Sequence, residues 1–146
     1  MKESIKNKFN LEGKVAIITG ASKGIGKSIA KGFIEFGAKV VISSRDQNSL
    51  EEVAKELGQE NILPIQCHVG KDKDIINLVN SVAKTFGRID VLVNNAATNP
   101  FYGELTNTDN ELFDKVINVN LKAPYLLANK CLPFMKKNSY GSIINI

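Results

Sequence analysis

The segment Thr19-Gly20-Ala21-Ser22-Lys23-Gly24-Ile25-Gly26 follows an apolar run and precedes a stretch of helical periodicity. At such a turn an early glycine permits a tight exit from a strand, and a middle glycine lets backbone N–H groups approach a phosphate. The last glycine allows the helix to pack closely. The helix N-terminus then presents unpaired donors and a positive dipole end to an anion. We therefore predict that a dinucleotide pyrophosphate binds here, at Gly20, Ser22, Lys23, Gly24, Ile25 and Gly26.

Outward from this turn, short runs rich in Val and Ile alternate with longer segments of helical period. The predicted strands are 15–19, 40–43, 62–67, 91–94 and 142–146. This alternation predicts an α/β fold, a Rossmann-type doubly wound parallel sheet with helices on both faces. We assign residues 11–146 to this dinucleotide-binding domain, incomplete in its fifth strand, and residues 1–10 to an N-terminal extension.

The helix boundaries are predicted from residues that favour helix ends. Gly37 is expected to end the helix that begins near Gly24. Pairs of a hydroxyl residue and a glutamate three positions later predict capping boxes for two further helices, at Ser49 with Glu52 and at Thr108 with Glu111.

Composition excludes several classes of protein. The chain has 146 residues, of which 43% are hydrophobic, enough for one globular core. Its net charge of +4 comes from dispersed lysines, so we expect no nucleic-acid partner. The apolar runs are far shorter than the roughly 20 residues of a membrane span. Cys67 and Cys131 form no CxxC pair and His68 is the only histidine, so we expect neither a metal site nor a disulfide but two buried thiols.

The end of the glycine-rich turn also resembles a P-loop, because Gly26-Lys27-Ser28 has the lysine and hydroxyl that hold a nucleoside triphosphate. A P-loop would need its first glycine at position 21, which is Ala21. The strand at 91–94 also runs into Asn94-Asn95 and supplies no Walker-B aspartate. We therefore favour a dinucleotide over a nucleoside triphosphate.

Three motifs in order resemble the classical short-chain dehydrogenase/reductases: the turn at 19–26, Asn94-Asn95-Ala96-Ala97 after the fourth strand, and Asn120 in a helix. The resemblance covers residues 11–146, about the first half of a typical member. It implies reversible hydride transfer between a nicotinamide and a carbonyl or alcohol substrate. The segments at 67–70 and 95–103 are most similar to the NADP-dependent carbonyl and retinal reductases, and a 3-oxoacyl-carrier-protein reductase is the alternative.

The cofactor is predicted from the end of the second strand. Members of the resembled family that prefer NAD carry an acidic residue where this chain has Ser44, and a carboxylate there repels a 2′-phosphate. Arg45 and Lys23 can instead bind that phosphate. We therefore expect NADP, with NAD less favoured. Asp46 lies about 20 residues past Gly26, near the distance of a ribose-binding acid, but we interpret it as a helix-start residue.

The resemblance also implies contacts at the next two strand ends. His68 replaces an aspartate that usually lies next to the adenine, and Val69 follows it with backbone contacts. An imidazole can still stack on or hydrogen-bond to adenine, although a surface histidine without this role is an alternative. Small residues after the fourth strand would lie beside the cofactor ribose, at Asn95, Ala96 and Ala97. Asn94 is expected to brace the sheet.

Asn120 falls on the apolar face of its predicted helix, so we expect it to be buried, whereas Asn118 falls on the polar side and should be solvated. The resemblance implies a catalytic role for Asn120, which in the family helps hold a water relay to the catalytic lysine. Pro124 is consistent with a bend in this helix. The alternative for Asn120 is a buried structural amide.

The resemblance further implies a proton-donating tyrosine, a lysine four residues after it and a serine. No tyrosine of this sequence is followed by lysine at that spacing. We expect a longer enzyme whose catalytic residues follow Ile146, and expect these 146 residues alone to be inactive. The alternative is a complete dinucleotide-binding sensor. The resemblance also implies a homo-oligomer, a dimer or tetramer, in the cytoplasm or, in a eukaryote, the peroxisome.

Overall fold

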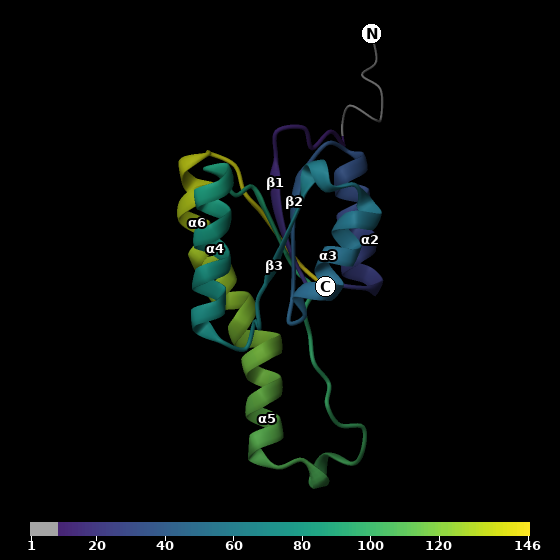
Figure 1. Cartoon of the computed structure of the whole chain (residues 1–146). Coiled ribbons are helices and arrows are strands. Elements are labelled where there is room, and N and C mark those ends of the chain that lie inside the picture. The colour runs from purple at the N-terminus through teal and green to yellow at the C-terminus, as the bar shows by residue number, and fades with distance from the viewer. Residues whose placement is uncertain (1–8) are drawn as a thin grey trace.

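A computed structural model describes residues 9–146 and contains one parallel sheet of five strands (Figure 1). The predicted fold class is confirmed, and each predicted strand end lies within one residue of the observed end. The predicted extension at 1–10 lies mostly outside the described residues and stays a prediction. The strands are β1 Val15–Thr19, β2 Lys39–Ser44, β3 Ile62–Gln66, β4 Val91–Asn94 and β5 Ser142–Asn145.

The strands lie in the order β3-β2-β1-β4-β5, so the chain reverses its direction of travel across the sheet between β3 and β4. β1 is paired in parallel with β2 on one side and with β4 on the other. In open parallel sheets this reversal leaves a crevice at the carboxyl ends of the two strands that flank it, here β1 and β4.

Helices cover both faces of the sheet, with α4 and α6 on one face and α2 and α3 on the other (Figure 1). Successive residues of β1 show why both faces are buried: Ile17 packs in the cluster under α4 and α6, and Ile18 packs in the cluster under α2 and α3. The helices are α2 Gly24–Glu35, α3 Gln47–Leu57, α4 Asp72–Phe86, α5 Asn110–Ile117 and α6 Ala123–Lys137.

The helix ends confirm some sequence signals and correct others. Gly37 follows α2 with a φ of +93°, which confirms its predicted role. The two predicted capping boxes are wrong. The cap of α3 is Asp46, which accepts from the Asn48 N–H, and the cap of α5 is Asp109, which accepts from the Leu112 N–H. In both cases the residue directly before the helix is an aspartate that supplies a carboxylate acceptor, so the nearby hydroxyl residues are not needed as caps.

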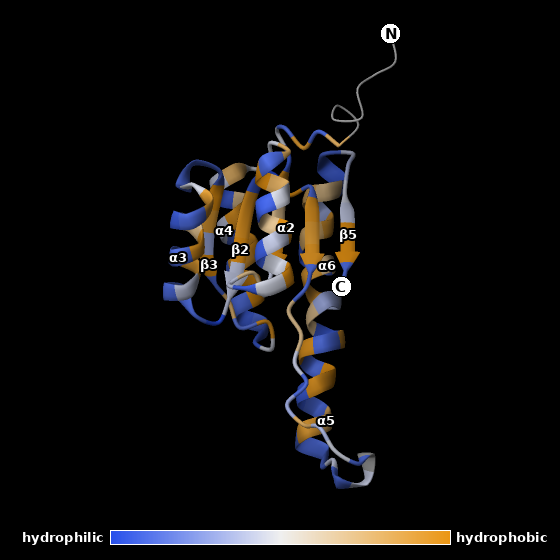
Figure 2. Ribbon diagram, turned by 90° about the vertical axis from the view of Figure 1, so that its right-hand side faces the viewer, coloured by the Kyte–Doolittle hydropathy of each residue, from blue (hydrophilic) through white to orange (hydrophobic). Residues whose placement is uncertain are grey.

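A single turn of π-helix, Asn118–Lys122, joins α5 to α6. The extra residue in this turn changes which side chains face the sheet, so the helical register predicted across α5 and α6 does not hold through it. Figure 2 shows α5 extending beyond the carboxyl ends of the strands. Pro124 lies in the first turn of α6, directly after the π-helical turn.

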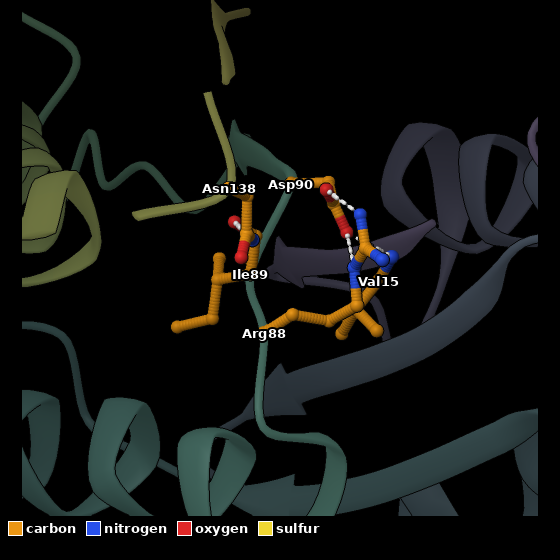
Figure 3. A network of polar contacts seen from close by, with 5 residues as sticks. All are labelled: Val15, Arg88, Ile89, Asp90 and Asn138. Carbon is orange, nitrogen blue, oxygen red and sulfur yellow. Dashed lines mark hydrogen bonds and ion pairs between the residues drawn. The ribbon is translucent and has the colours of Figure 1, made fainter. Parts of the chain in front are cut away.

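A polar network fastens the opposite end of the sheet (Figure 3). The buried Asp90 carboxylate accepts from the Val15 N–H at 2.9 Å and from Arg88 Nε and Nη2 at 2.8 and 2.7 Å. Burial opposes ionisation of Asp90, but the Arg88 and Val15 hydrogen bonds outweigh it and hold its pKa below the ordinary value. The Asn138 side chain adds a bond to the Ile89 carbonyl at 3.3 Å. The network links the start of β1 to β4 and α6.

Both cysteines are buried, as predicted, and burial raises the pKa of Cys67 to about 11 and that of Cys131 to about 12. Within residues 9–146, no helix is both long enough and apolar enough to span a bilayer.

Candidate functional site

A cavity of about 380 Å³ opens at the carboxyl ends of the strands, where the sheet order predicts a crevice. The turn after β1 contributes Gly20, Ser22, Lys23 and Ile25. The ends of β2 and β3 contribute Ser44, Arg45, Cys67, His68 and Val69. The segment after β4 contributes Asn95, Ala96, Ala97 and Thr98. Most of the predicted cofactor-binding residues therefore surround one cavity.

The glycine-rich turn is held in a shape that only glycine allows. Gly20 and Gly24 have φ values of +67° and +57°, in the left-handed region that other residues rarely adopt. A Cβ on Gly26 would lie 2.6 Å from the Gly20 carbonyl oxygen and 2.9 Å from the Ala21 Cα. Gly24 and Gly26 do not line the cavity; Gly24 supplies the left-handed backbone of the turn, and Gly26 allows α2 to pack closely against it.

Asn95 ties the loop after β4 to this turn. Its Nδ2 donates to the carbonyl oxygens of Thr19 at 2.9 Å and Gly20 at 3.1 Å. The Thr19 hydroxyl oxygen accepts from the backbone N–H groups of Asn95 and Ala96. The side-chain amide of Asn95 is therefore occupied within the protein, and its contribution to the cavity is the shape of the loop. The role of Thr19 was not predicted, although a threonine ending a strand directly before the first glycine is a sequence signal for it.

Two cations line the cavity, Lys23 from the turn after β1 and Arg45 from the end of β2. Arg45 and Lys23 are both exposed, and neither forms an ion pair within the described part of the chain. Ser44, which also lines the cavity, is uncharged, and its hydroxyl donates to the Asp46 carbonyl oxygen at 3.2 Å. Asp46 itself caps α3, and the hydrogen bond from Ser49 lowers its pKa, which confirms its interpretation as a helix-start residue.

The residues that resembled a P-loop have other partners. Lys27 Nζ forms an ion pair with Glu56 at 2.5 Å, and the Ser28 hydroxyl donates to the Gly24 carbonyl oxygen within the helix. Neither side chain lines the cavity. The geometry of a triphosphate site is therefore not present at this turn.

His68, just after β3, forms hydrogen bonds with residues of the loop and helix that follow it. The His68 Nδ1 accepts from the Gly70 N–H at 3.0 Å, and the His68 N–H donates to the Asp74 carboxylate at 3.0 Å. Asn118 donates through its side chain to the Gly70 carbonyl at 2.9 Å. His68 is half-buried and lines the cavity beside Val69. These hydrogen bonds hold the imidazole against the loop that follows β3.

The predicted environments of the two asparagines after α5 are reversed. Asn120 is exposed, and its side chain donates to the Thr98 carbonyl at 2.9 Å and accepts from the Thr98 N–H at 2.8 Å. Asn118 is half-buried and bonds to Gly70. The π-helical turn causes this reversal, because it starts at Asn118 and rotates the following residues relative to an α-helix. Asn120 does not line the cavity, but Thr98, which it holds, does.

Two further lining residues, Lys115 and Val119, were not predicted. They are four residues apart on α5 and the π-helical turn, so they share one side of that segment. Asn94 is buried, and its Nδ2 donates to the Asn145 side-chain oxygen at 2.9 Å, which confirms that it braces β4 against β5.

This fold and site define a dinucleotide-binding domain, and comparison with known proteins assigns it to a family. Residues 14–146 match the family model described as short chain dehydrogenase. The chain belongs to the short-chain dehydrogenase/reductase family, as its motifs predicted.

Curated relatives agree with this assignment. The human protein "Dehydrogenase/reductase SDR family member 4" is 40% identical over 136 residues, which are 92% of this chain and 49% of the relative. "Tropinone reductase-like 3" from Erythroxylum coca is 41% identical over 146 residues, covering 99% of this chain and 56% of the relative. The chain therefore spans about half the length of the curated relatives it matches.

Two solved structures have the same fold. A metagenomic short-chain oxidoreductase in complex with NADP is 39% identical, with a TM-score of 0.88 over 92% of this chain and 62% of that one. The 3-ketoacyl-(acyl-carrier-protein) reductase from Brucella melitensis complexed with NADH is 38% identical, with a TM-score of 0.88. The match covers 93% of this chain and 57% of that one. One neighbour holds NADP and the other NADH, so the cofactor must be argued from the residues of this chain.

Proposed function

We propose that the whole protein is an NADP(H)-dependent oxidoreductase that transfers hydride reversibly between the nicotinamide and a carbonyl or alcohol. The observation that carries this proposal is that two exposed cations, Lys23 and Arg45, line the cavity together with the uncharged Ser44. The bound nicotinamide would supply the hydride. The chain's own residues would bind and orient the dinucleotide.

The residues fit a dinucleotide at each of its anionic groups. Gly20 lines the cavity without a side chain, so the backbone of the turn can approach a pyrophosphate there. The first N–H groups of α2 have no side-chain cap, so they remain available to a phosphate. Arg45 can bind a 2′-phosphate in two-pronged geometry, and Lys23 adds a second positive charge.

The NAD alternative requires a free carboxylate near the ribose, and Asp46 is the only acid close to that position in the sequence. Its two oxygens accept from Asn48 and Ser49 in the cap of α3. Using Asp46 to bind a ribose would disrupt that cap, which typically stabilises a helix by about 1 kcal/mol. The residues therefore favour NADP.

The cofactor proposal is tested by measuring the dissociation constants of NADPH and NADH for the double variant Lys23→Ala/Arg45→Ala. Loss of two charge-assisted contacts should weaken NADPH binding by roughly a hundredfold and leave NADH binding almost unchanged. The matched control is Lys31→Ala, which removes an exposed lysine of α2. An unchanged NADPH/NADH ratio in the double variant would refute the proposal.

Asn120 is proposed to act by positioning the loop that follows β4. Its two hydrogen bonds with the backbone of Thr98 hold that residue of the loop in place beside the cavity. We further propose that these 146 residues bind the dinucleotide without turning over substrate, because none of their tyrosines is followed by lysine four positions later. Dinucleotide binding without NADPH oxidation is the expected result for this chain, and carbonyl-dependent oxidation would contradict it.

A 3-oxoacyl-carrier-protein reductase is the second candidate, and the likeness to the Brucella melitensis enzyme is the observation in its favour. The similarity of the segments 67–70 and 95–103 to carbonyl reductases favours a free ketone or aldehyde. Comparing kcat/KM of the whole protein for a 3-oxoacyl thioester and for simple ketones separates the two. The homo-oligomeric state and the cellular compartment remain predictions.

A further inference from the structure

The π-helical turn between α5 and α6 is bonded at two points to the segment that follows β3. Asn118 Nδ2 donates to the Gly70 carbonyl oxygen at 2.9 Å. Lys122 Nζ donates to the two carboxylate oxygens of Asp72 at 3.0 and 3.1 Å. Gly70 directly follows Val69, which lines the cavity. The turn therefore supports the loop that forms one wall of the cavity.

The same turn is bonded to the loop that follows β4. The Asn120 side chain accepts from the Thr98 N–H at 2.8 Å and donates to the Thr98 carbonyl oxygen at 2.9 Å. Thr98 lines the cavity, and so does Val119, the buried residue between the two asparagines. The two loops follow strands that are separated in the sheet by β2 and β1. One turn of helix thus holds two loops that lie apart from each other.

The turn lies at the boundary between two helices that differ in how firmly they are packed. Among the described residues, α5 buries none of its side chains, whereas α6 buries Leu127 and Cys131 in the core. A π-helical turn leaves the regular α-helical bonding pattern and is often found at functional sites. The bonds from Asn118, Asn120 and Lys122 to the loops therefore fix the position of this boundary.

The orientation of a dinucleotide in the cavity decides what this turn connects. Lys23 and Arg45, from the turn after β1 and the end of β2, are the proposed contacts of the 2′-phosphate. In the sheet β3 lies beyond β2, and β4 lies beyond β1. The adenosine half would therefore meet the loop that Asn118 holds, and the nicotinamide half would meet the loop that Asn120 holds.

We propose that Asn118 is a positioning residue, through which binding of the adenosine half orders the loop after β4 that receives the nicotinamide half. This inference rests on the proposed dinucleotide-binding function. The adenosine half restrains the loop at Gly70, the hydrogen bond to Asn118 restrains the π-helical turn, and Asn120 passes the restraint to Thr98. A segment that is ordered by one part of a ligand costs less entropy to order by the other part.

Amide hydrogen exchange at Thr98, measured by NMR on the whole protein, tests this coupling. The probe is adenosine 2′,5′-bisphosphate, which lacks the nicotinamide half. Its dissociation constant is measured for each variant, so that exchange is compared at saturation. The probe should slow Thr98 exchange about fivefold in the unaltered protein and no more than about twofold in Asn118→Ala. The matched control is Asn129→Ala, which removes an exposed side-chain amide of α6 and should behave as the unaltered protein.

A second variant keeps the size and shape of the side chain. In Asn118→Asp at neutral pH the carboxylate cannot donate to the Gly70 carbonyl, so the slowing at Thr98 should again be lost. The proposal is overturned if either variant of Asn118 retains the full slowing, or if the bound probe leaves Thr98 exchange unchanged in the unaltered protein. If the probe and NADPH both fail to bind the unaltered protein, it is the proposed function that fails.

Discussion

The side-chain amide of Asn95 lies 3.1 Å from the carbonyl oxygen of Gly20, so the loop after β4 holds the glycine-rich turn after β1 in place. The same amide also bonds to Thr19. The Asn95 side chain therefore joins the carboxyl ends of β1 and β4, the two strands that flank the crevice. The shape of the proposed pyrophosphate site depends on a residue 75 positions away in the sequence.

Replacing Asn95 should weaken both the fold and dinucleotide binding. Asn95→Ala removes two hydrogen bonds to half-buried backbone carbonyls, so we expect the free energy of unfolding to fall by about 1–2 kcal/mol and NADPH to bind more weakly. Urea denaturation and NADPH titration measure the two effects. Asn99→Ala, an exposed asparagine on the same loop, is the control, and equal effects in both variants would contradict the role of Asn95.

Two glycines of α2 should respond in opposite ways to alanine. In Gly26→Ala the new Cβ would meet the Gly20 carbonyl at 2.6 Å, and backbone cannot move aside cheaply, so we expect a loss of about 1–3 kcal/mol. In Gly32→Ala the Cβ meets nothing within 4 Å, so the variant should gain roughly 0.5–1 kcal/mol from reduced backbone entropy. Denaturation midpoints of both variants test this, and a stabilised Gly26→Ala would refute the packing argument.

Because of the buried Asp90, the free energy of unfolding should decrease at acidic pH. Its pKa is held below the ordinary 3.8, so its contribution is complete above that value and is lost as the pH falls through the lower folded value. Asp90→Asn should show a smaller loss of stability on acidification, measured as the urea midpoint against pH. An unchanged pH dependence in this variant would show that Asp90 is not the responsible group.

The partner of Asp90 should matter more than a surface ion pair. Arg88→Ala leaves a buried carboxylate with fewer donors and should cost about 2 kcal/mol, less than a fully buried pair because the Arg88 side chain is 40% exposed. Lys122→Ala removes an ion pair to Asp72 between side chains that are 49% and 56% exposed, and should cost below about 1 kcal/mol. Chemical denaturation of both variants gives the comparison. Equal losses of stability in the two variants would contradict the greater contribution of the Arg88–Asp90 pair.

Asn120 should protect the backbone of Thr98 from solvent exchange. In Asn120→Ala the Thr98 N–H loses its acceptor, so its amide hydrogen exchange should become faster, whereas Asn120→Asp keeps an acceptor and should retain most of the protection. Exchange measured by NMR at Thr98 distinguishes these outcomes. Equal exchange in all three proteins would show that the side chain does not hold the loop.

Much of the fold follows from local sequence. Alternating Val and Ile runs predict all five strands, and Gly37 predicts the end of α2, because period and backbone freedom are properties of a few adjacent residues. The capping boxes fail for a local reason as well, since Asp46, three residues before Ser49, and Asp109, one residue after Thr108, are the caps instead. The cations that line the cavity were also predictable, because Lys23 lies in the glycine-rich turn and Arg45 directly follows a recognisable strand end.

The sequence by itself determined the glycine-rich turn, the βαβ order and the charge at the end of β2, since each depends on neighbouring residues. Tertiary structure alone decided which asparagine serves which loop. The π-helical turn exposes Asn120 and turns Asn118 towards Gly70, and a helical wheel cannot anticipate it, because the extra residue depends on contacts with two distant loops.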